Sequence, residues 1–160
     1  MKKFLAVLLA TVLALGIVAC GSKGDSGSGS DVKGEKQTGG NITVLVPENM
    51  SLTQGDLLDK SNPDAVSISE TKNALKYIQV FVKEETAIDD SMDMTREVNS
   101  ECTFKDVTIG NFSGYSYDSN GINCIQLKGK VGDKNVQIAA AYFDNDDEIL
   151  KAVIDSVEIK

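Results

Sequence analysis

Apolar and polar residues alternate with a period of two through most of the chain after residue 40, and this pattern limits the folds open to it. Ile42, Val44 and Val46 occupy every second position of one such run, which Pro47 ends. Because successive side chains of a strand point to opposite faces, the spacing predicts a β-strand rather than a helix. The same pattern predicts strands over residues 65–70, 75–84, 103–109, 112–118, 122–131, 135–143 and 157–159.

Turn signals predict how these strands connect. Asn120-Gly121 lies between two of the runs, and this pair suits a two-residue type I′ hairpin turn, which needs positive φ at both positions. Gly132-Asp133-Lys134 supplies the next reversal. We therefore expect the four strands between residues 103 and 143 to form an antiparallel meander.

Two helices are predicted, over residues 89–100 and 146–155. Met92, Val98 and Met94 give the first a thin apolar face, and the apolar residues of the second are spaced three and four apart to form one stripe. The run over residues 75–84 is apolar on both faces, which favours a sheet covered from both sides. The predicted fold class is α+β, an antiparallel sheet covered by helices.

Residues 1–19 are typical of a secretory signal peptide. Lys2 and Lys3 precede an almost unbroken apolar run over residues 4–19, and a positive start followed by a short apolar stretch is the usual order in such signals. A helix needs about 20 apolar residues to cross a bilayer, so a permanent membrane span is the weaker interpretation.

The end of this run, Ile17-Val18-Ala19-Cys20-Gly21, resembles the bacterial lipobox. In lipobox proteins the Cys carries a diacylglycerol and becomes the new N-terminus, so the resemblance implies lipidation of Cys20 at the extracytoplasmic face of the cell membrane. Two acyl chains hold a protein stably because each buried methylene contributes ~0.8 kcal/mol. The alternative interpretation is a buried Cys20 at the end of an apolar helix.

Residues 20–40 are predicted to form a flexible tether. The segment is rich in Gly and Ser, and its charges nearly cancel, so it has little with which to build a core. A Gly-rich coil of this length has an r.m.s. span of roughly 25 Å. The chain is thus predicted to consist of a signal peptide (1–19), a tether (20–40) and one folded domain (41–160).

The predicted domain is acidic, and the chain contains no histidine. Residues 41–160 hold 11 Lys and Arg against 21 Asp and Glu, a net charge of −10. A field of that sign repels phosphate backbones, so we expect no nucleic-acid partner. The lack of His removes the usual general base, the usual zinc ligand and the Ser–His and Cys–His pairs. We therefore expect no enzymatic activity, and no motif indicates a cofactor or a metal.

Cys102 and Cys124 are the other cysteines, and a pair in an exported chain suggests a disulfide. The predicted hairpin argues against the bond, because it places Cys124 opposite Tyr117 and Tyr117 opposite about Phe104. The two cysteine Cα atoms would then be about 12 Å apart, from ~4.8 Å strand spacing and ~3.4 Å rise. A disulfide spans at most ~7 Å. A disulfide and two free thiols both stay open.

Tyr77, Tyr115, Tyr117 and Tyr142 are candidates for a binding surface, because they occur on or next to predicted strands. Aromatic rings with a polar end can line a ligand groove, and they can equally form the wet edge of a core. Both interpretations stay open.

The acidic run over residues 144–148 suggests a calcium site, but it lacks the Gly and the final Glu of an EF-hand loop. The other interpretation is that Asp144 or Asn145 caps the following helix, whose positive end the remaining acids favour. Asp89 and Asp90 allow the same two interpretations for the helix around Met92.

Three segments together resemble the PsbP-like family: "ITVLVPE" at 42–48, "FSGYSYD" at 112–118 and "KGKVGDKNVQIAAAYFDNDDEILKAVIDSVEIK" at 128–160. The resemblance lies in the order and texture of the elements. It implies an antiparallel sheet between helices, an α/β/α sandwich. Family members include thylakoid-lumen photosystem subunits and many small bacterial lipoproteins. The metal-linked His positions of the photosynthetic members have no counterpart in this chain, so the resemblance implies no oxygen-evolving role.

These features predict a lipid-anchored extracytoplasmic domain that acts by binding, as an accessory factor for a membrane or envelope complex with a protein partner. The alternative is a small-ligand or cation-binding lipoprotein. An enclosed pocket containing Tyr and carboxylate side chains would favour that alternative.

Overall fold

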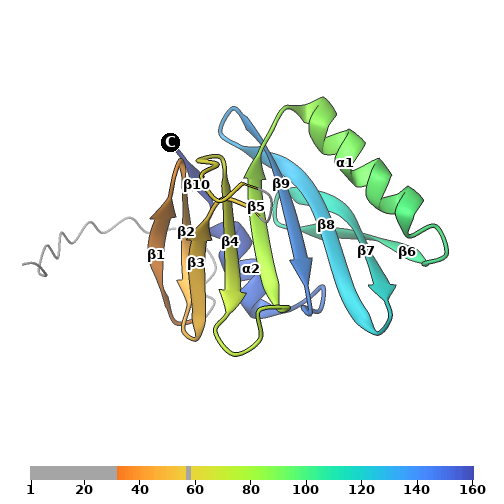
Figure 1. Ribbon diagram of the computed structural model, residues 1–160, viewed down its shortest axis with the longest axis horizontal. Coiled ribbons are helices and arrows are strands. Elements are labelled where there is room, and N and C mark those ends of the chain that lie inside the picture. The colour runs from red at the N-terminus through yellow and green to blue at the C-terminus, as the bar shows by residue number, and fades with distance from the viewer. Residues whose placement is uncertain (1–31, 57–58) are drawn as a thin grey trace, which may run out of the picture.

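The computed structural model describes residues 32–56 and 59–160, which form ten strands and two helices (Figure 1). The predicted signal peptide, the lipobox-like sequence with Cys20 and the first part of the predicted tether lie outside the described residues. The elements in chain order are β1 (Gly34–Gly39), β2 (Ile42–Pro47), β3 (Met50–Gln54), β4 (Ala65–Glu70), β5 (Tyr77–Val82), α1 (Glu85–Val98), β6 (Phe104–Ile109), β7 (Phe112–Ser119), β8 (Ile122–Val131), β9 (Lys134–Ala141), α2 (Glu148–Asp155) and β10 (Glu158–Ile159). The prediction of a sheet-rich, antiparallel fold is confirmed.

The larger sheet has seven strands in the order β3-β4-β5-β9-β8-β7-β6. Strands β6 to β9 form the predicted meander. Asn120 and Gly121 connect β7 to β8 with φ angles of 55° and 82°, both positive as a type I′ turn requires. The register pairs Cys124 with Tyr117 and Tyr117 with Phe104, as the hairpin predicted.

The smaller sheet, in the order β1-β2-β10, corrects the predicted tether. The sequence predicts a flexible segment up to residue 40, yet β1 pairs with β2 from Gly34 opposite Pro47 to Gly39 opposite Ile42. Strand β1 has almost no apolar side chain that would indicate a strand, and its pairing is through the main chain. At Gly39 an added Cβ would lie 2.7 Å from a methyl of Val66. Ordered structure therefore starts before residue 41.

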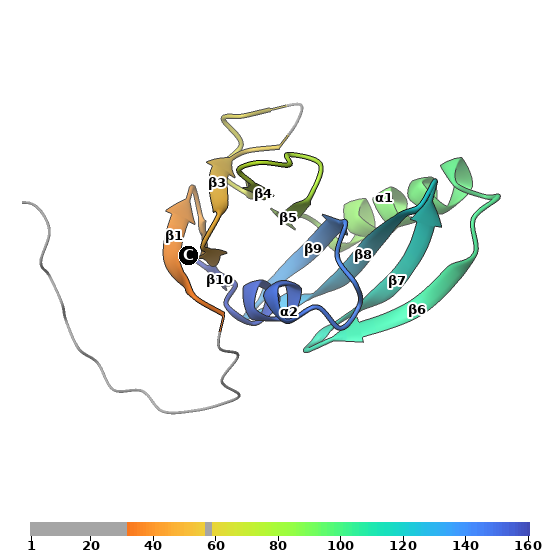
Figure 2. The same cartoon turned by 90° about the horizontal axis from the view of Figure 1, so that it is seen from below.

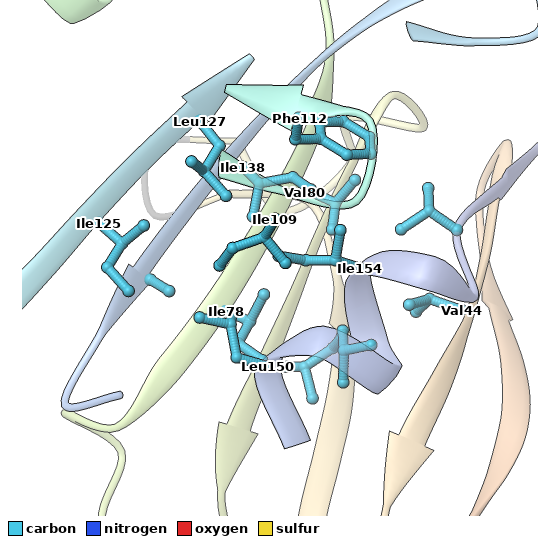
Figure 3. Packing of buried hydrophobic residues seen from close by; sticks show 14 of the residues in the cluster. Val44, Ile78, Val80, Ile109, Phe112, Ile125, Leu127, Ile138, Leu150 and Ile154 are labelled. Carbon is cyan, nitrogen blue, oxygen red and sulfur yellow. The ribbon is translucent and has the colours of Figure 1, made fainter. Parts of the chain in front are cut away.

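The main hydrophobic core lies between the larger sheet, α2 and β2. Leu127 and Ile138 from the sheet, Leu150 from α2 and Val44 from β2 are all completely buried, and Figure 3 shows these side chains converging. Burial of one such side chain contributes about 1.5–3 kcal/mol. This core is the main source of the domain's stability.

Asp147 caps α2. Its Oδ1 accepts hydrogen bonds from the backbone N–H groups of Ile149 at 2.8 Å and Leu150 at 3.3 Å. The prediction of a cap in the acidic run is confirmed, but the residue is Asp147 rather than Asp144 or Asn145. The reason is a turn ahead of the helix, in which the Asp144 carbonyl accepts a bond from the N–H of Asp147.

Helix α1 begins about one turn before the predicted start at residue 89. Asp89 and Asp90 therefore lie inside the helix, and the cap predicted at these residues is wrong. Asp89 instead forms an ion pair with Lys128 of β8. Ile88 and Met92 are the buried residues of the helix.

The two helices lie on opposite faces of the larger sheet (Figure 2), and α1 leaves part of its face without a helix (Figure 1). On β5, Ile78 and Val80 face α2 and are completely buried, whereas Tyr77 and Phe81 face the other way and stay partly exposed. The prediction that both faces of this strand are covered is wrong, because α1 packs over β7 and β8 instead.

Candidate functional site

The candidate site is built on the face of the larger sheet that carries α1. The strand register arranges its side chains in rows. From β4 to β6, one row contains Ser69, Tyr77, Ala141, Cys124, Tyr117 and Phe104, and the next contains Ser67, Gln79, Ala139, Gln126, Tyr115 and Asp106. The β6 end of the rows is aromatic and is packed against α1. The other end is made of small and polar residues with one aromatic ring.

An aromatic cluster fixes α1 to the β6 end of this face. The Phe104 ring lies 5.2 Å from the ring centroids of both Tyr115 and Tyr117. The Tyr115 hydroxyl donates a hydrogen bond of 2.6 Å to the carbonyl oxygen of Met92. Burial raises the pKa of Tyr115, because removal from water disfavours the charged phenolate.

The structure separates the four tyrosines that the sequence proposes as a binding surface. Tyr115 and Tyr117 belong to the buried aromatic cluster, with exposures of 1% and 9%. Tyr142 follows β9 with a positive φ of 66° and is exposed. Tyr77 is partly exposed on β5. Of these four residues, Tyr77 is the one that a strand places on the uncovered part of the face.

Cys102 and Cys124 are both free thiols, and both pack against the aromatic cluster. The register that argued against a disulfide is confirmed, since Tyr117 lies between Cys124 and the β6 strand. Burial raises the pKa of the Cys124 thiol. A thiol that is held protonated in this way is a poor nucleophile.

Polar contacts fix the position of α1 across β8 and β9. Lys128 pairs with Asp89, and the hydrogen bond from Lys128 to Asp89 raises the pKa of the lysine. Gln137 of β9 is almost completely buried. Its Nε2 donates to Ser91 Oγ at 3.2 Å and to Gln126 Oε1 at 3.3 Å. These contacts orient the helix and so determine what lies on either side of it.

On the β6 side of α1 there is a groove in two parts, of about 450 and 510 Å³. Ser113 and Lys128 line both parts. Arg96 and Asp106 line the second part, where the Arg96 guanidinium lies 4.2 Å from the Tyr115 ring centroid. The volumes fall in the range of small-molecule sites, and charges of both signs line the groove.

On its β9 side, α1 exposes an apolar stripe, Met94 and Val98. These residues are 63% and 77% exposed, and residues four apart lie on the same side of a helix. Ser91, three residues before Met94, bonds to Gln137 of β9, so this side of the helix is directed toward β9. The sequence prediction that Met94 and Val98 face the core is wrong, and Met92 is the buried member of the predicted face.

On the same side of the sheet as α1, over β4 and β5, lies what we call the open sheet face: Ser67, Ser69, Tyr77, Gln79 and Phe81. All five side chains are partly exposed, and they point to the α1 side of β4 and β5. Lys83 lies 4.4 Å above the Phe81 ring and donates a hydrogen bond to Gln137. The apolar stripe and the open sheet face together give this side of the domain an unpaired, partly apolar surface.

A second groove, of about 710 Å³, lies where the acidic run meets β7 and β8. Asn145 Nδ2 donates to Ser116 Oγ at 3.1 Å, and Asn123 Nδ2 donates to the Phe143 carbonyl at 2.7 Å. Within the part of the chain that the structure describes, no three thiol or carboxylate groups gather closely enough to hold a metal ion. The hydrogen bonds of Asn145 hold the run against Ser116 of β7 and Asn123 of β8.

Sequence reasoning missed the groove and the open sheet face. Arg96 and Lys128 gain their positions from the way α1 crosses the sheet, and no local pattern reports that crossing. The apolar stripe did leave a signal. The predicted face of α1 was thin, and the structure shows that two of its three residues, Met94 and Val98, do not belong to the core.

Comparison with known proteins adds little to this geometry. No family model and no curated protein matches the chain. A crystal structure of a protein from Bacteroides thetaiotaomicron VPI-5482 is similar, with a TM-score of 0.45 and 11% sequence identity. The likeness covers 79% of this chain and 48% of the other, so this chain spans about half the length of that protein. Neither helix of the described residues has the length and apolarity needed to cross a bilayer.

Proposed function

We propose that the protein is a lipid-anchored, extracytoplasmic, non-catalytic domain that binds a protein partner, as an accessory factor of a membrane or envelope complex. The lipobox ending in Cys20 supports the anchor. The observation that carries the binding role is the exposed apolar stripe of α1, on the same side of the sheet as the open sheet face. Large apolar side chains exposed next to a sheet surface without a helix mark an interaction site more often than single scattered ones do.

Photo-crosslinking in intact membranes tests the binding role. p-Benzoylphenylalanine in place of Val98 should give an adduct of one defined mass, because this side chain is 77% exposed on the apolar stripe. The matched control is the same probe at Leu75, which is 64% exposed in the connection from β4 to β5. Equal labelling at both positions, or none at Val98, would contradict the proposal.

Membrane fractionation tests the anchor. Cys20→Ala removes the sulfur that the lipid needs, so the variant should leave the membrane fraction or keep the mass of the uncut precursor. Cys124→Ala is the control, since that thiol is partly buried in the folded domain. Unchanged mass and membrane partitioning of Cys20→Ala would rule out lipidation.

The groove on the β6 side of α1 favours a second candidate function, small-ligand or cation binding. Arg96, Lys128 and Asp106 offer groups of both signs to a polar ligand. Free amino acids and calcium chloride are suitable probes in a thermal-shift measurement. A ligand of the groove should raise the midpoint of the wild type; the effect of an amino acid should be mostly lost in Arg96→Ala, and that of calcium in Asp106→Ala.

We also propose that the domain is PsbP-like, with its sheet between helices as an α/β/α sandwich. The positions of α1 and α2 on opposite faces support this finer description (Figure 2). Superposition on an experimentally solved PsbP-like domain tests it. The strand order β3-β4-β5-β9-β8-β7-β6 should recur, and a different order in that domain would exclude the relationship.

A further inference from the structure

We infer that the partner segment is a basic amphipathic helix, which lies along the apolar stripe of α1 and over the open sheet face. This inference rests on the proposed function, because it names the kind of partner that the same surface binds. Three arguments support it: the charge of α1, the exposed apolar side chains, and the exclusion of other partners for this surface.

Charge is the first argument. Helix α1 contains five acidic residues and one basic residue: Glu85, Asp89, Asp90, Asp93, Glu97 and Arg96. Asp89 pairs with Lys128, and the ion pairs found in residues 32–56 and 59–160 do not include the other four acids. A partner with Lys or Arg along one side would complement this charge.

Three of these acids, Asp89, Asp93 and Glu97, lower the intrinsic helix stability of α1. Asp93 lies four residues after Asp89 and four before Glu97, and like charges at this spacing repel. Glu97 also lies in the last turn, where the helix dipole disfavours a negative charge. A departure of this kind from good helix design is expected at functional positions, and basic side chains from a partner would remove the repulsion.

Apolar exposure is the second argument. Met94 and Val98 are exposed on the side of α1 that is directed toward β9, and the partly exposed rings of Tyr77 and Phe81 lie on β5, the strand next to β9. Between them, β9 contributes Ala139 and Ala141, which are small and largely buried, with exposures of 7% and 4%. A partner helix with one apolar side would cover both the apolar stripe and the open sheet face, as α2 covers the opposite face of the sheet.

Charge also disfavours two other occupants. In an isologous dimer through α1, the same acids would face each other, and like charges across an interface cost affinity. An anionic membrane surface repels Asp90 and Glu97 for the same reason. A basic helix from another protein has the complementary sign, and its apolar side matches the exposed stripe.

Peptide binding tests the inference on the full chain in phosphatidylcholine nanodiscs, with empty nanodiscs as the blank. The probe is a peptide of Leu and Lys spaced to give one apolar and one basic helical face. Its counterpart carries Glu in place of every Lys. We expect the Lys peptide to bind and the Glu peptide not to bind. Because the contact is exposed and charged, binding should weaken several-fold between about 50 and about 300 mM NaCl.

Two variants locate the contact. Asp90→Lys combined with Glu97→Lys should weaken binding of the Lys peptide about tenfold or more. Asp144→Lys combined with Asp146→Lys changes the net charge equally on another surface and should leave binding within about twofold. Met94→Lys should also weaken binding, and Leu75→Lys is its control. Circular dichroism checks that each variant is folded. Equal losses in variants and controls, or binding of the Glu peptide, would overturn the inference.

The crosslinks separate this inference from the proposed function. A partner captured at Val98 whose crosslinked segment is acidic, or is not helical, would overturn the inference and leave the binding role intact. An adduct of twice the protein's own mass would show a second copy and would also overturn it. Absence of any adduct at Val98 contradicts the binding role itself.

Discussion

The two faces of the larger sheet differ although the same strands build both. Ile78, Ile125 and Ile138 point to the α2 side and are completely buried. Their neighbours in sequence, Gln79, Gln126 and Gln137, point to the α1 side. One face is thus apolar and closed by α2 and β2, while the other is partly polar and half covered. Because side chains alternate between the faces, the α2 face forms the stabilising core, and the α1 face remains available for contacts with α1 and with other molecules.

This difference has a consequence for stability. Apolar burial contributes in proportion to area, about 25 cal/mol per Å². A hydrogen bond in the polar network beneath α1 exchanges protein for water partners and contributes only about 0.5–1.5 kcal/mol. We therefore expect α1 to open more easily than the α2 core, as elements that take part in binding often do.

The largest effect is expected in the α2 core. Ile138→Ala removes a completely buried side chain and should lower the free energy of unfolding by about 2–5 kcal/mol, measured in urea. Gln137→Ala, one residue earlier, alters the α1 face and should cost about 1–3 kcal/mol through lost hydrogen bonds. A larger loss for Gln137→Ala than for Ile138→Ala would contradict the contrast between the faces.

Alkaline pH should destabilise the α1 face in particular. Burial raises the pKa of Cys124 above its ordinary 9.0 and raises the pKa of Tyr117 above its ordinary 10.0. A raised pKa contributes stability that is present below the unfolded value and is lost as pH rises through the folded value. The free energy of unfolding should therefore fall from about pH 9 upward, by at most about 1.4 kcal/mol per pH unit for each group.

Tyr117→Phe sharpens this test, because it removes one of the titrating groups from the aromatic cluster. The fall in stability above pH 10 should be shallower in the variant than in the wild type. Val44 and the rest of the α2 core hold no such group, so hydrogen exchange should show protection lost first in α1. Uniform loss of protection across both helices would oppose this expectation.

The sequence predicted most strands because alternation reports a strand with one buried face. It predicted β4 and β8 with their observed bounds. It missed β1, whose side chains are nearly all polar, and β3, which has partly buried residues only at alternate positions. For these two strands the pairing partner determines the structure.

The candidate site was less predictable than the fold. The buried role of Tyr115 and the exposure of Val98 both depend on where α1 crosses the sheet. That crossing is set by Lys128 and Gln137, which lie far from α1 in the sequence. Local periodicity carries no information on such distant contacts.

Tyr115→Phe should have a moderate effect. It removes the hydroxyl that donates to the Met92 carbonyl at 2.6 Å and keeps the ring. The free energy of unfolding should fall by about 1 kcal/mol, and the amides of α1 should exchange faster. Tyr142→Phe is the control, since that side chain is exposed. Equal exchange rates of α1 in both variants would show that the hydroxyl does not hold the helix.

The smallest effect is expected from the ion pair between Asp89 and Lys128. Its side chains are 47% and 44% exposed, so water and salt screen the charges. A double-mutant cycle with Asp89→Asn and Lys128→Met should give a coupling of less than about 1 kcal/mol that declines with added salt. If the coupling exceeded the loss in Tyr115→Phe, α1 would be held mainly by charge rather than by the aromatic cluster. The α1 face would then differ from the α2 face even more strongly than its side chains suggest, because its attachment would depend on ionic strength.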